Sequence, residues 1–263
     1  MLFRSVRAGW TTWATGRSLA ALAELAAVGC RTAALDVTDE DSVVAAVEHV
    51  LATSGAIDVL VNNAGAGPSG AIEEFSLADW RRLFETNVFG VATVTRHVLP
   101  AMRARGQGRI IIVGSMGGEF TTPLVGAYHA SKYAVEAVAD ALRVEVAPFG
   151  IQVALIQPGP VKTRMAAQTA VTPPGEQSLY APALARMRKT AQSALATGTG
   201  FLEPAQVAAV ILRAATRRRS GARHKIGVVA HLLPWLRRWL PLSWWDAMQA
   251  SLIAWTTKAR TAT

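Results

Sequence analysis

The chain has 263 residues, 51% of them hydrophobic, which is enough to form the core of one α/β domain. Its one cysteine, Cys30, excludes an internal disulfide framework, and we expect it to be a small buried apolar residue and not part of a metal site. No apolar stretch reaches the roughly 18 residues of a spanning helix, and the first residues do not resemble a signal peptide. We therefore expect a cytoplasmic protein without a metal centre.

The net charge of +9 is concentrated at the C-terminal end of the chain. Residues 1–212 hold 17 basic and 17 acidic side chains, whereas residues 213–263 hold ten basic side chains and one acidic. Basic surfaces attract nucleic acids or anionic membranes. No recognised nucleic-acid-binding motif accompanies this charge, so we expect no nucleic-acid partner.

Short apolar runs alternate with longer amphipathic ones along most of the sequence. Strands are expected at residues 11–15, 31–37, 57–63, 109–115, 151–157 and 224–230, and helices at 18–29, 39–55, 77–106 and 128–150. This alternation predicts an α/β fold with a doubly wound parallel sheet, covered by helices on both faces. Residues 163–203 differ, with two adjacent prolines and scattered Gly, Ser and Thr, which is typical of a functional lid or a disordered loop.

The segment YHASK places Tyr128 and Lys132 four residues apart, on one face of a predicted helix. An ammonium beside a phenol favours the phenolate, so we expect Lys132 to lower the pKa of Tyr128 toward the working range of an acid or base. Ser115 ends a predicted strand at the edge where ligands of parallel sheets gather, and its hydroxyl could hold a reacting oxygen. Each signal alone also fits a solvated helix face or a turn residue.

A third element follows the predicted strand at 57–63, where the sequence reads NNAG. The small residues Ala64 and Gly65, after Asn62 and Asn63, permit close approach of a flat ligand. Further along the chain, Asn87 lies in the segment ETNVFG and a PGPVKT segment begins at Pro158.

Together, NNAG, ETNVFG, the GS that ends at Ser115, YHASK and PGPVKT resemble the short-chain dehydrogenase/reductase family, from about residue 9 to 165, with a looser match to the end. The resemblance implies a Rossmann-type sheet that binds a nicotinamide dinucleotide and interconverts an alcohol and a carbonyl. It also implies four catalytic roles: Tyr128 as proton donor or acceptor, Lys132 as its activator and a ribose ligand, Ser115 as holder of the substrate oxygen, and Asn87 in proton relay.

The resemblance implies cofactor contacts as well. The adenine would lie at Asp36 and Val37, and the nicotinamide along Pro158, Gly159, Val161 and Thr163. Further contacts with the cofactor would come from Asn62, Ala64 and Gly65.

The expected cofactor is NADP, with NAD less favoured. Family members that use NAD place an acidic residue at the end of the strand that corresponds to residues 11–15, where this chain has Gly16 and Arg17. An arginine there suits a 2′-phosphate. The alternative is that Arg17 is an ordinary surface arginine.

The sequence departs from the family at its beginning, because the strand and TGxxxGxG turn that receive the pyrophosphate are not found in it. The segment GAGPSG at 65–70 fits GxGxxG by letters, but it follows a later strand and belongs to the NNAG element. We therefore expect an N-terminally truncated fold, in which loss of a central strand separates the first two visible strands from the others. Two explanations remain open, a start further upstream or a degenerate relative that keeps the fold without the chemistry.

Residues 231–263 are expected to form a basic, tryptophan-rich helical extension, outside the Rossmann-type domain of residues 1–230. In HLLPWLRRWLP the side chains of Leu232, Trp235, Leu236 and Trp239 fall on one helical face, and Ser243 to Asp246 resemble a capping box of a second helix. Such helices suit a membrane interface, or they cover the substrate pocket or a subunit contact in a homo-oligomer. Both interpretations favour a hydrophobic substrate.

The function expected from these observations is NADP(H)-dependent interconversion of an alcohol and a carbonyl on a steroid, retinoid or lipid-like substrate. The alternative is a non-catalytic scaffold or a membrane-surface interaction protein.

Overall fold

The computed structural model describes residues 2–163, 178–198 and 200–253. Its described part contains six strands, close to the six expected positions. They are β1 (Trp13–Gly16), β2 (Arg31–Ala34), β3 (Val59–Asn62), β4 (Gly108–Val113), β5 (Ile151–Pro158) and β6 (Arg223–Ile226). The sixth is shorter than predicted, because Gly227 adopts a φ of 91° and a helix begins at Val228.

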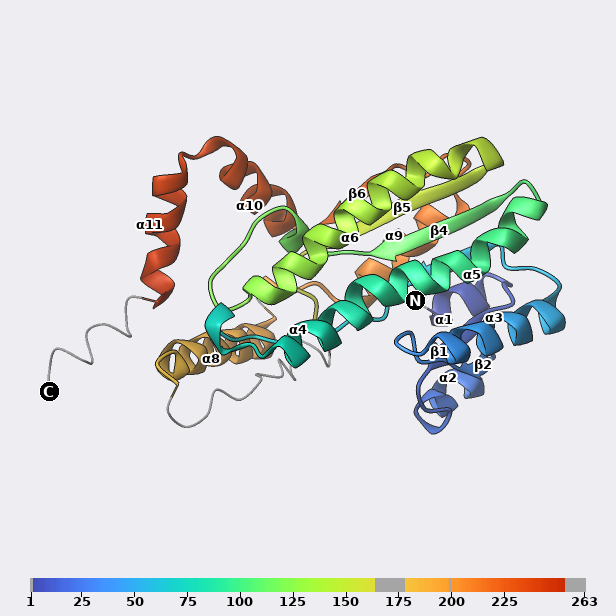
Figure 1. Cartoon of the computed structure of the whole chain (residues 1–263), viewed down its shortest axis with the longest axis horizontal. Coiled ribbons are helices and arrows are strands. Elements are labelled where there is room, and N and C mark those ends of the chain that lie inside the picture. The colour runs from blue at the N-terminus through green and yellow to red at the C-terminus, as the bar shows by residue number, and fades with distance from the viewer. Residues whose placement is uncertain (1, 164–177, 199, 254–263) are drawn as a thin grey trace, which may run out of the picture.

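The six strands are parallel and form two separate sheets (Figure 1). One contains β1 and β2, and the other has the order β3-β4-β5-β6. The sequence-based expectation that the first two strands would be separated from the rest is therefore confirmed. The protein has an α/β fold of the Rossmann type, in which the parallel strands of the described part form two sheets instead of one continuous sheet.

Helices of the described part surround these sheets (Figure 1). They are α1 (Leu2–Arg7), α2 (Ala23–Ala27), α3 (Glu40–Ser54), α4 (Leu77–Phe84), α5 (Gly90–Ala104), α6 (Gly126–Glu145), α8 (Ala181–Thr197), α9 (Pro204–Thr216), α10 (Val228–Trp239) and α11 (Leu242–Ile253). Shorter 3-10 turns lie at Ala20–Leu22, Ile72–Glu74, Met116–Gly118 and Ala147–Phe149.

Alternating side chains of the central strands supply a core on each face of the larger sheet. Ile110 and Ile112 of β4 belong to the cluster that also contains side chains of α3, α5 and α6. Ile111, between them, belongs to a second cluster, which contains side chains of α9. Because successive side chains of a strand point to opposite faces, these runs of buried residues require cover on both sides. The prediction of helices on both faces is confirmed.

The ends of α3 follow from local sequence. Asp39 accepts hydrogen bonds from the backbone N–H groups of Asp41 and Ser42, which have no partner within the helix. Gly55 ends the helix with a φ of 74°, a left-handed conformation that glycine adopts at little cost. The predicted helix at 39–55 is therefore confirmed.

The predicted helix at 77–106 is interrupted, which corrects the expectation of one continuous helix. A π-helical turn at Glu85–Phe89 lies between α4 and α5. Such turns widen a helix locally and are frequent at functional sites. This one contains Asn87, so the interruption bears directly on the candidate site.

The segment 163–203 lies partly outside the described residues, at 164–177 and 199. Its remaining part contains α8, so a large share of it is helical. Ala183 and Leu184 of α8 pack against Ala71 and Leu124 in the body of the protein. A lid function for this segment stays a prediction.

The C-terminal helices α10 and α11 lie at the opposite end of the molecule from β1 and β2 (Figure 1). The predicted capping box at Ser243 is wrong, because α11 already begins at Leu242 and the N–H of Trp244 donates to the carbonyl of Pro241. Proline fits such a helix start because it has no N–H to satisfy. Within the described ranges no helix is long and apolar enough to cross a membrane.

Candidate active site

Two polar residues mark the edge of the larger sheet where the candidate site lies. Asn62 is the last residue of β3, and Ser115 follows the end of β4 by two positions. The two strands are parallel neighbours, paired from Val59–Arg109 to Asn62–Ile112, so their carboxyl ends meet at one edge. Asn62 is buried and donates from Nδ2 to Thr95 Oγ1 at 3.0 Å, which fixes its side chain.

Ser115 is held by the turn that it begins. Its Oγ accepts a hydrogen bond from Gly117 N at 3.1 Å, at the start of the 3-10 turn Met116–Gly118. The Ser115 side chain also makes a hydrogen bond with the side chain of Tyr128. Ser115 therefore lies where it can share an oxygen ligand with the phenol, as its position at the end of the strand suggested.

Tyr128 lies in the first turn of α6, and burial raises the pKa of its phenol above the usual value. The hydrogen bond with Ser115 acts in the opposite direction but is the smaller effect. The expectation of a lowered pKa is wrong, because burial destabilises the phenolate by more than the neighbouring groups stabilise it. A phenol whose pKa is raised keeps its proton at neutral pH, as a proton donor to a carbonyl oxygen must.

Lys132 lies one turn further along α6 and is also buried, with 6% of its surface exposed. Its Nζ donates to the carbonyl oxygen of Val113 at 3.0 Å and lies 5.8 Å from the centroid of the Tyr128 ring. Burial lowers the pKa of Lys132 to about 8, against the charge of Glu136, which raises it. The ammonium is therefore positioned near the phenol, but its charge is easily lost as the pH rises.

Asn87 is almost fully buried in the π-helical turn between α4 and α5. Its Oδ1 accepts from Ala66 N at 2.8 Å, while its Nδ2 donates to Ala66 O and to Ser131 Oγ, both at 2.9 Å. Ser131 Oγ in turn donates to the carbonyl oxygen of Tyr128 at 2.7 Å. Asn87 thus joins the loop after β3 to the start of α6 through backbone groups and Ser131.

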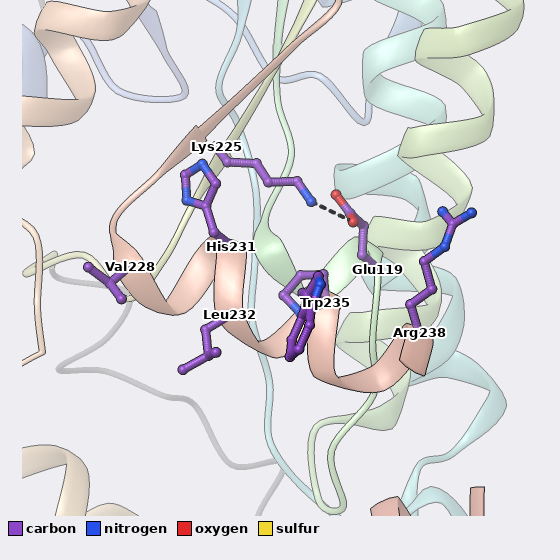
Figure 2. A pocket seen from close by; sticks show the side chains of 8 residues that line it. Glu119, Lys225, Val228, His231, Leu232, Trp235 and Arg238 are labelled. Carbon is purple, nitrogen blue, oxygen red and sulfur yellow. Dashed lines mark hydrogen bonds and ion pairs between the residues drawn. The ribbon is translucent and has the colours of Figure 1, made fainter. Parts of the chain in front are cut away.

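A buried polar network behind Lys132 was missed from the sequence. Gln157 Nε2 donates to Glu136 Oε1 at 2.9 Å and to Glu119 Oε1 at 2.6 Å. Glu119 pairs with Lys225 at 2.8 Å, as Figure 2 shows, and Glu136 pairs with Arg223 at 3.1 Å. The available signal was Glu136, a carboxylate four residues after Lys132 on the buried face of a helix.

Leu124, in the loop between Ser115 and Tyr128, was also missed. It is the one non-glycine residue of the described ranges with a positive φ, 65°, a conformation that costs on the order of 1–3 kcal/mol. Its carbonyl accepts from Gly70 N at 2.7 Å, and its side chain packs in the cluster with Ala183 and Leu184. The strained turn therefore holds the loop between Ser115 and Tyr128 against α8.

The residues expected at the adenine end follow the two strands of the smaller sheet. Arg17 follows β1 and is exposed, and its charge contributes to a lowered pKa of Asp36, after the larger effect of hydrogen bonds from Thr38. Val37 lies against Gly90, where an added Cβ would come within 2.8 Å of Val37 Cγ2. The structure thus brings Arg17 and Asp36 near each other at the ends of the smaller sheet's strands, whereas Tyr128 lies on α6, which packs against the larger sheet.

The remaining expected cofactor contacts lie after β3 and after β5. Ala64 is exposed and Gly65 is half-buried in the loop after β3. Pro158 ends β5, and Gly159 N donates to Ile226 O at 2.9 Å. Val161 forms a parallel bridge with Leu202, and Thr163 follows it as an exposed residue.

The chemistry of these donors fits the two ends of a nicotinamide dinucleotide. At one end, a lysine ammonium has three donor hydrogens, of which the contact with Val113 O uses one, so Lys132 can also reach ribose hydroxyls. At the other end, Asp36 and the exposed Arg17 can receive an adenosine ribose or its phosphate. Between the two ends, the sequence lacks the glycine-rich turn that ordinarily receives a pyrophosphate.

Comparison with known proteins identifies relatives of this chain. The family model described as short chain dehydrogenase matches residues 3–173. An uncharacterized oxidoreductase, YusZ, of Bacillus subtilis is 37% identical over 219 residues, which is 82% of this chain and 77% of that protein. The 3-ketodihydrosphingosine reductase of Bacteroides thetaiotaomicron is 36% identical over 213 residues, which is 80% of this chain and 78% of that protein.

Solved structures agree with this likeness. A short-chain dehydrogenase from Streptomyces avermitilis is 34% identical, with a TM-score of 0.79 over 99% of this chain and 92% of that one. A short-chain dehydrogenase/reductase from Burkholderia phymatum in complex with NAD is 26% identical, with a TM-score of 0.76 over 90% and 88%. A gluconate 5-dehydrogenase from Burkholderia cenocepacia in complex with NADP and tartrate is 31% identical, with a TM-score of 0.58 over 65% and 70%.

Two sequence-based expectations are affected by these comparisons. The family model is matched from residue 3, which gives no support to the expected loss of an N-terminal unit. Relatives in complex with NAD and with NADP both occur, so the comparisons do not distinguish the two cofactors. The family itself is shown by the matched residues and the identities: the chain belongs to the short-chain dehydrogenases, a family of oxidoreductases.

Proposed function

We propose that the protein is an NADP(H)-dependent oxidoreductase that interconverts an alcohol and a carbonyl on a hydrophobic, lipid-like substrate. The observation that carries the proposal is the grouping of Ser115, Tyr128 and Lys132 at the carboxyl edge of the larger sheet, where burial raises the pKa of the Tyr128 phenol. These three side chains can bind, orient and protonate one oxygen atom.

In the reductive direction, Ser115 and Tyr128 would hold the carbonyl oxygen of the substrate between their hydroxyl groups. A bound nicotinamide supplies the hydride that the carbonyl carbon receives. The Tyr128 hydroxyl gives its proton to the oxygen, so that the alcohol leaves neutral, and the nearby Lys132 ammonium stabilises the phenolate that remains. In oxidation the same phenolate would accept the alcohol proton.

The preference for NADP rests on Arg17. It is exposed at the end of β1 and close enough to Asp36 to influence its pKa, so an adenosine ribose bound at Asp36 would lie within reach of a cation. A guanidinium can bind a phosphate with two hydrogen bonds, whereas it offers less to a ribose diol.

A hydrophobic substrate is supported by the surroundings of the loop between Ser115 and Tyr128. Leu124 and Leu184 are buried in an apolar cluster between the loop and α8, and Tyr180 and Met187 pack against it. The relative from Bacteroides thetaiotaomicron is named for 3-ketodihydrosphingosine, a long-chain lipid. Steroids and retinoids are further candidates of the same hydrophobic class.

The test is turnover by the purified chain. We would follow consumption of NADPH and of NADH with 3-ketodihydrosphingosine, with a steroid ketone and with butanone as a short control. The proposal predicts faster reduction with NADPH than with NADH, and of the long substrates than of butanone. Nucleotide binding without reduction of any ketone, and without oxidation of the matching alcohols, would contradict it.

A second candidate is a non-catalytic scaffold of the same family. The observation that favours it is the interrupted sheet, together with a sequence that lacks the TGxxxGxG turn. Backbone amides of that turn ordinarily meet the pyrophosphate at a helix N-terminus. A chain that binds neither NADPH nor NADH would belong to this class, so nucleotide binding separates the two candidates before any substrate is known.

A further inference from the structure

The helix α10 exposes a row of apolar side chains on one face. Val228, Leu232, Trp235 and Trp239 follow each other at intervals of four, three and four residues, and their exposed fractions are 80%, 47%, 58% and 68%. Such spacing places them along one side of a helix. A monomeric protein rarely leaves so much contiguous apolar surface in water unless something binds there.

The next helix, α11, is attached to the protein by one side. Trp245 is 2% exposed and meets the ring of Phe120 edge-on at 6.0 Å, while Gln249, one turn later, is also buried. The neighbouring Leu242 and Trp244 are 58% and 68% exposed. One tryptophan therefore anchors the helix, and the adjacent tryptophan points into solvent.

The charge around these helices identifies what can cover them. Arg237 and Arg238 lie in the last turn of α10, where Arg238 is exposed, and the sequence of the two helices contains one acidic residue, Asp246. A second copy of the chain, docked through the same face, would bring arginines against arginines. An anionic lipid surface would instead supply opposite charge, and its headgroup region is where tryptophan and arginine side chains are favoured.

We propose that α10 and α11 form a docking face for an anionic lipid bilayer, with Trp235, Trp239 and Trp244 in the headgroup region and the exposed Arg238 at the lipid phosphates. The helices would lie on the bilayer, in agreement with the finding that no described helix can cross one. The proposal concerns the surface alone and does not depend on nucleotide binding or catalysis.

Residues of the docking face also line a pocket that includes Glu119, from the loop between Ser115 and Tyr128. This pocket has a volume of about 680 Å³, and α10 lines it with Leu232, Trp235 and Arg238 (Figure 2). On its other side lie Lys225 and Glu119, the latter in the loop between Ser115 and Tyr128. The anchor Trp245 reaches the same loop through Phe120, which packs on His129, the neighbour of Tyr128. Docking would therefore place the bilayer beside the loop that carries the site.

Co-sedimentation with vesicles tests the proposal on the full chain. We would compare vesicles of phosphatidylcholine alone with vesicles that also contain phosphatidylserine, at low and at high salt. We expect binding to the anionic vesicles that weakens with salt.

Variants of the docking face test the same proposal. The pair Trp239→Ala with Trp244→Ala should weaken vesicle binding by about tenfold or more, because the apolar contact of both indole rings with the bilayer is lost. Arg237→Gln with Arg238→Gln should weaken binding to anionic vesicles by roughly tenfold to thirtyfold and leave neutral vesicles unaffected.

Matched variants keep the test specific. Phe149→Ala removes another exposed aromatic, 42% exposed in the turn after α6, and should bind vesicles like the unchanged chain. Quenching of tryptophan fluorescence by brominated lipids provides a second measurement on the unmodified protein. The proposal is overturned if anionic vesicles are not bound, if the paired variants bind equally well, or if those variants dissociate a dimer without affecting vesicle binding.

Discussion

The larger sheet and the smaller sheet of this protein differ in how they are supported. Strands β3 to β6 are covered on both faces, and their two clusters contain side chains from α3, α5, α6 and α9. Strands β1 and β2 rest on a small cluster of Ala14, Leu22 and Cys30, with Val6 and Leu25 beside it. The candidate catalytic residues Ser115, Tyr128 and Lys132 lie beside the first region, and Arg17 and Asp36 follow the strands of the second.

Under the proposed function, this difference means that proton transfer and nucleotide selection would rest on different parts of the molecule. Lys132 donates to the carbonyl oxygen of Val113 in β4 of the larger sheet, and Ser115 is held by Gly117 in the turn that follows the same strand. Binding of the adenine end of the cofactor would depend on how the smaller sheet is held next to the larger one. Substitutions in one region should therefore change one property and leave the other nearly intact.

The largest effect is expected for Tyr128→Phe, which removes only the hydroxyl that transfers the proton. Turnover should fall by about 10²- to 10⁴-fold, while the dissociation constant for NADPH stays within about twofold. Steady-state kinetics and fluorescence titration measure the two quantities. Tyr133→Phe, on the same helix but exposed, serves as the control and should leave both unchanged. A Tyr128→Phe variant with unaltered turnover would remove the proton-transfer role.

The next effect is on stability, through Asn87→Ala. The substitution leaves Ala66 N and Ser131 Oγ in a buried place without their amide partner, which should lower the free energy of unfolding by about 1–3 kcal/mol. Urea denaturation measures the change. Asn63→Ala removes an exposed amide nearby and should cost much less. Equal stability of the two variants would mean that the π-helical turn does not depend on Asn87.

Arg17→Ser should weaken NADPH binding by about tenfold and leave NADH binding nearly unchanged, because only the 2′-phosphate requires the cation. Calorimetric titration with both nucleotides checks this. Arg81→Ser removes an exposed arginine from α4 and should alter neither affinity. If Arg17→Ser weakened both nucleotides equally, Arg17 would act on the shared part of the cofactor and the preference would lie elsewhere.

The smallest effect is expected for Glu136→Gln, in the pH dependence of reduction. Lys132 has a pKa of about 8, so the rate should decline as the pH rises through that value and its charge is lost. Glu136 raises the pKa of Lys132, so removing its charge should move the decline to lower pH. Asp140→Asn removes another carboxylate that pairs with Arg223 but is two turns from Lys132, and should leave the profile in place. An unmoved profile in Glu136→Gln would exclude this electrostatic link.

The strands and the central motif could be predicted because their signals are local. The six strands appear as apolar runs, and YHASK places Tyr128 and Lys132 on one helix, as the structure has them. The π-helical turn at Asn87 could not be predicted, because it arises from tertiary contacts with Ala66 and Ser131 and not from helix propensity. For this reason the sequence predicted one continuous helix where the structure has α4 and α5.

The electrostatics of the site also depended on packing that a sequence does not display. The spacing of Tyr128 and Lys132 suggested a lowered phenol pKa, but the burial of both groups reversed the result. The contribution of Glu136 depends on Gln157, which comes from a strand 21 residues further along the chain. Burial and long-range partners thus determine the protonation states, while the spacing determines only which groups are neighbours.

The measurement that tests the central claim most directly is calorimetric titration of the purified 263-residue chain with NADPH and with NADH. The proposed oxidoreductase should bind one NADPH per chain, and bind it more tightly than NADH. Absence of binding by either nucleotide would contradict the account, and the interrupted sheet would then mark a scaffold without catalytic function.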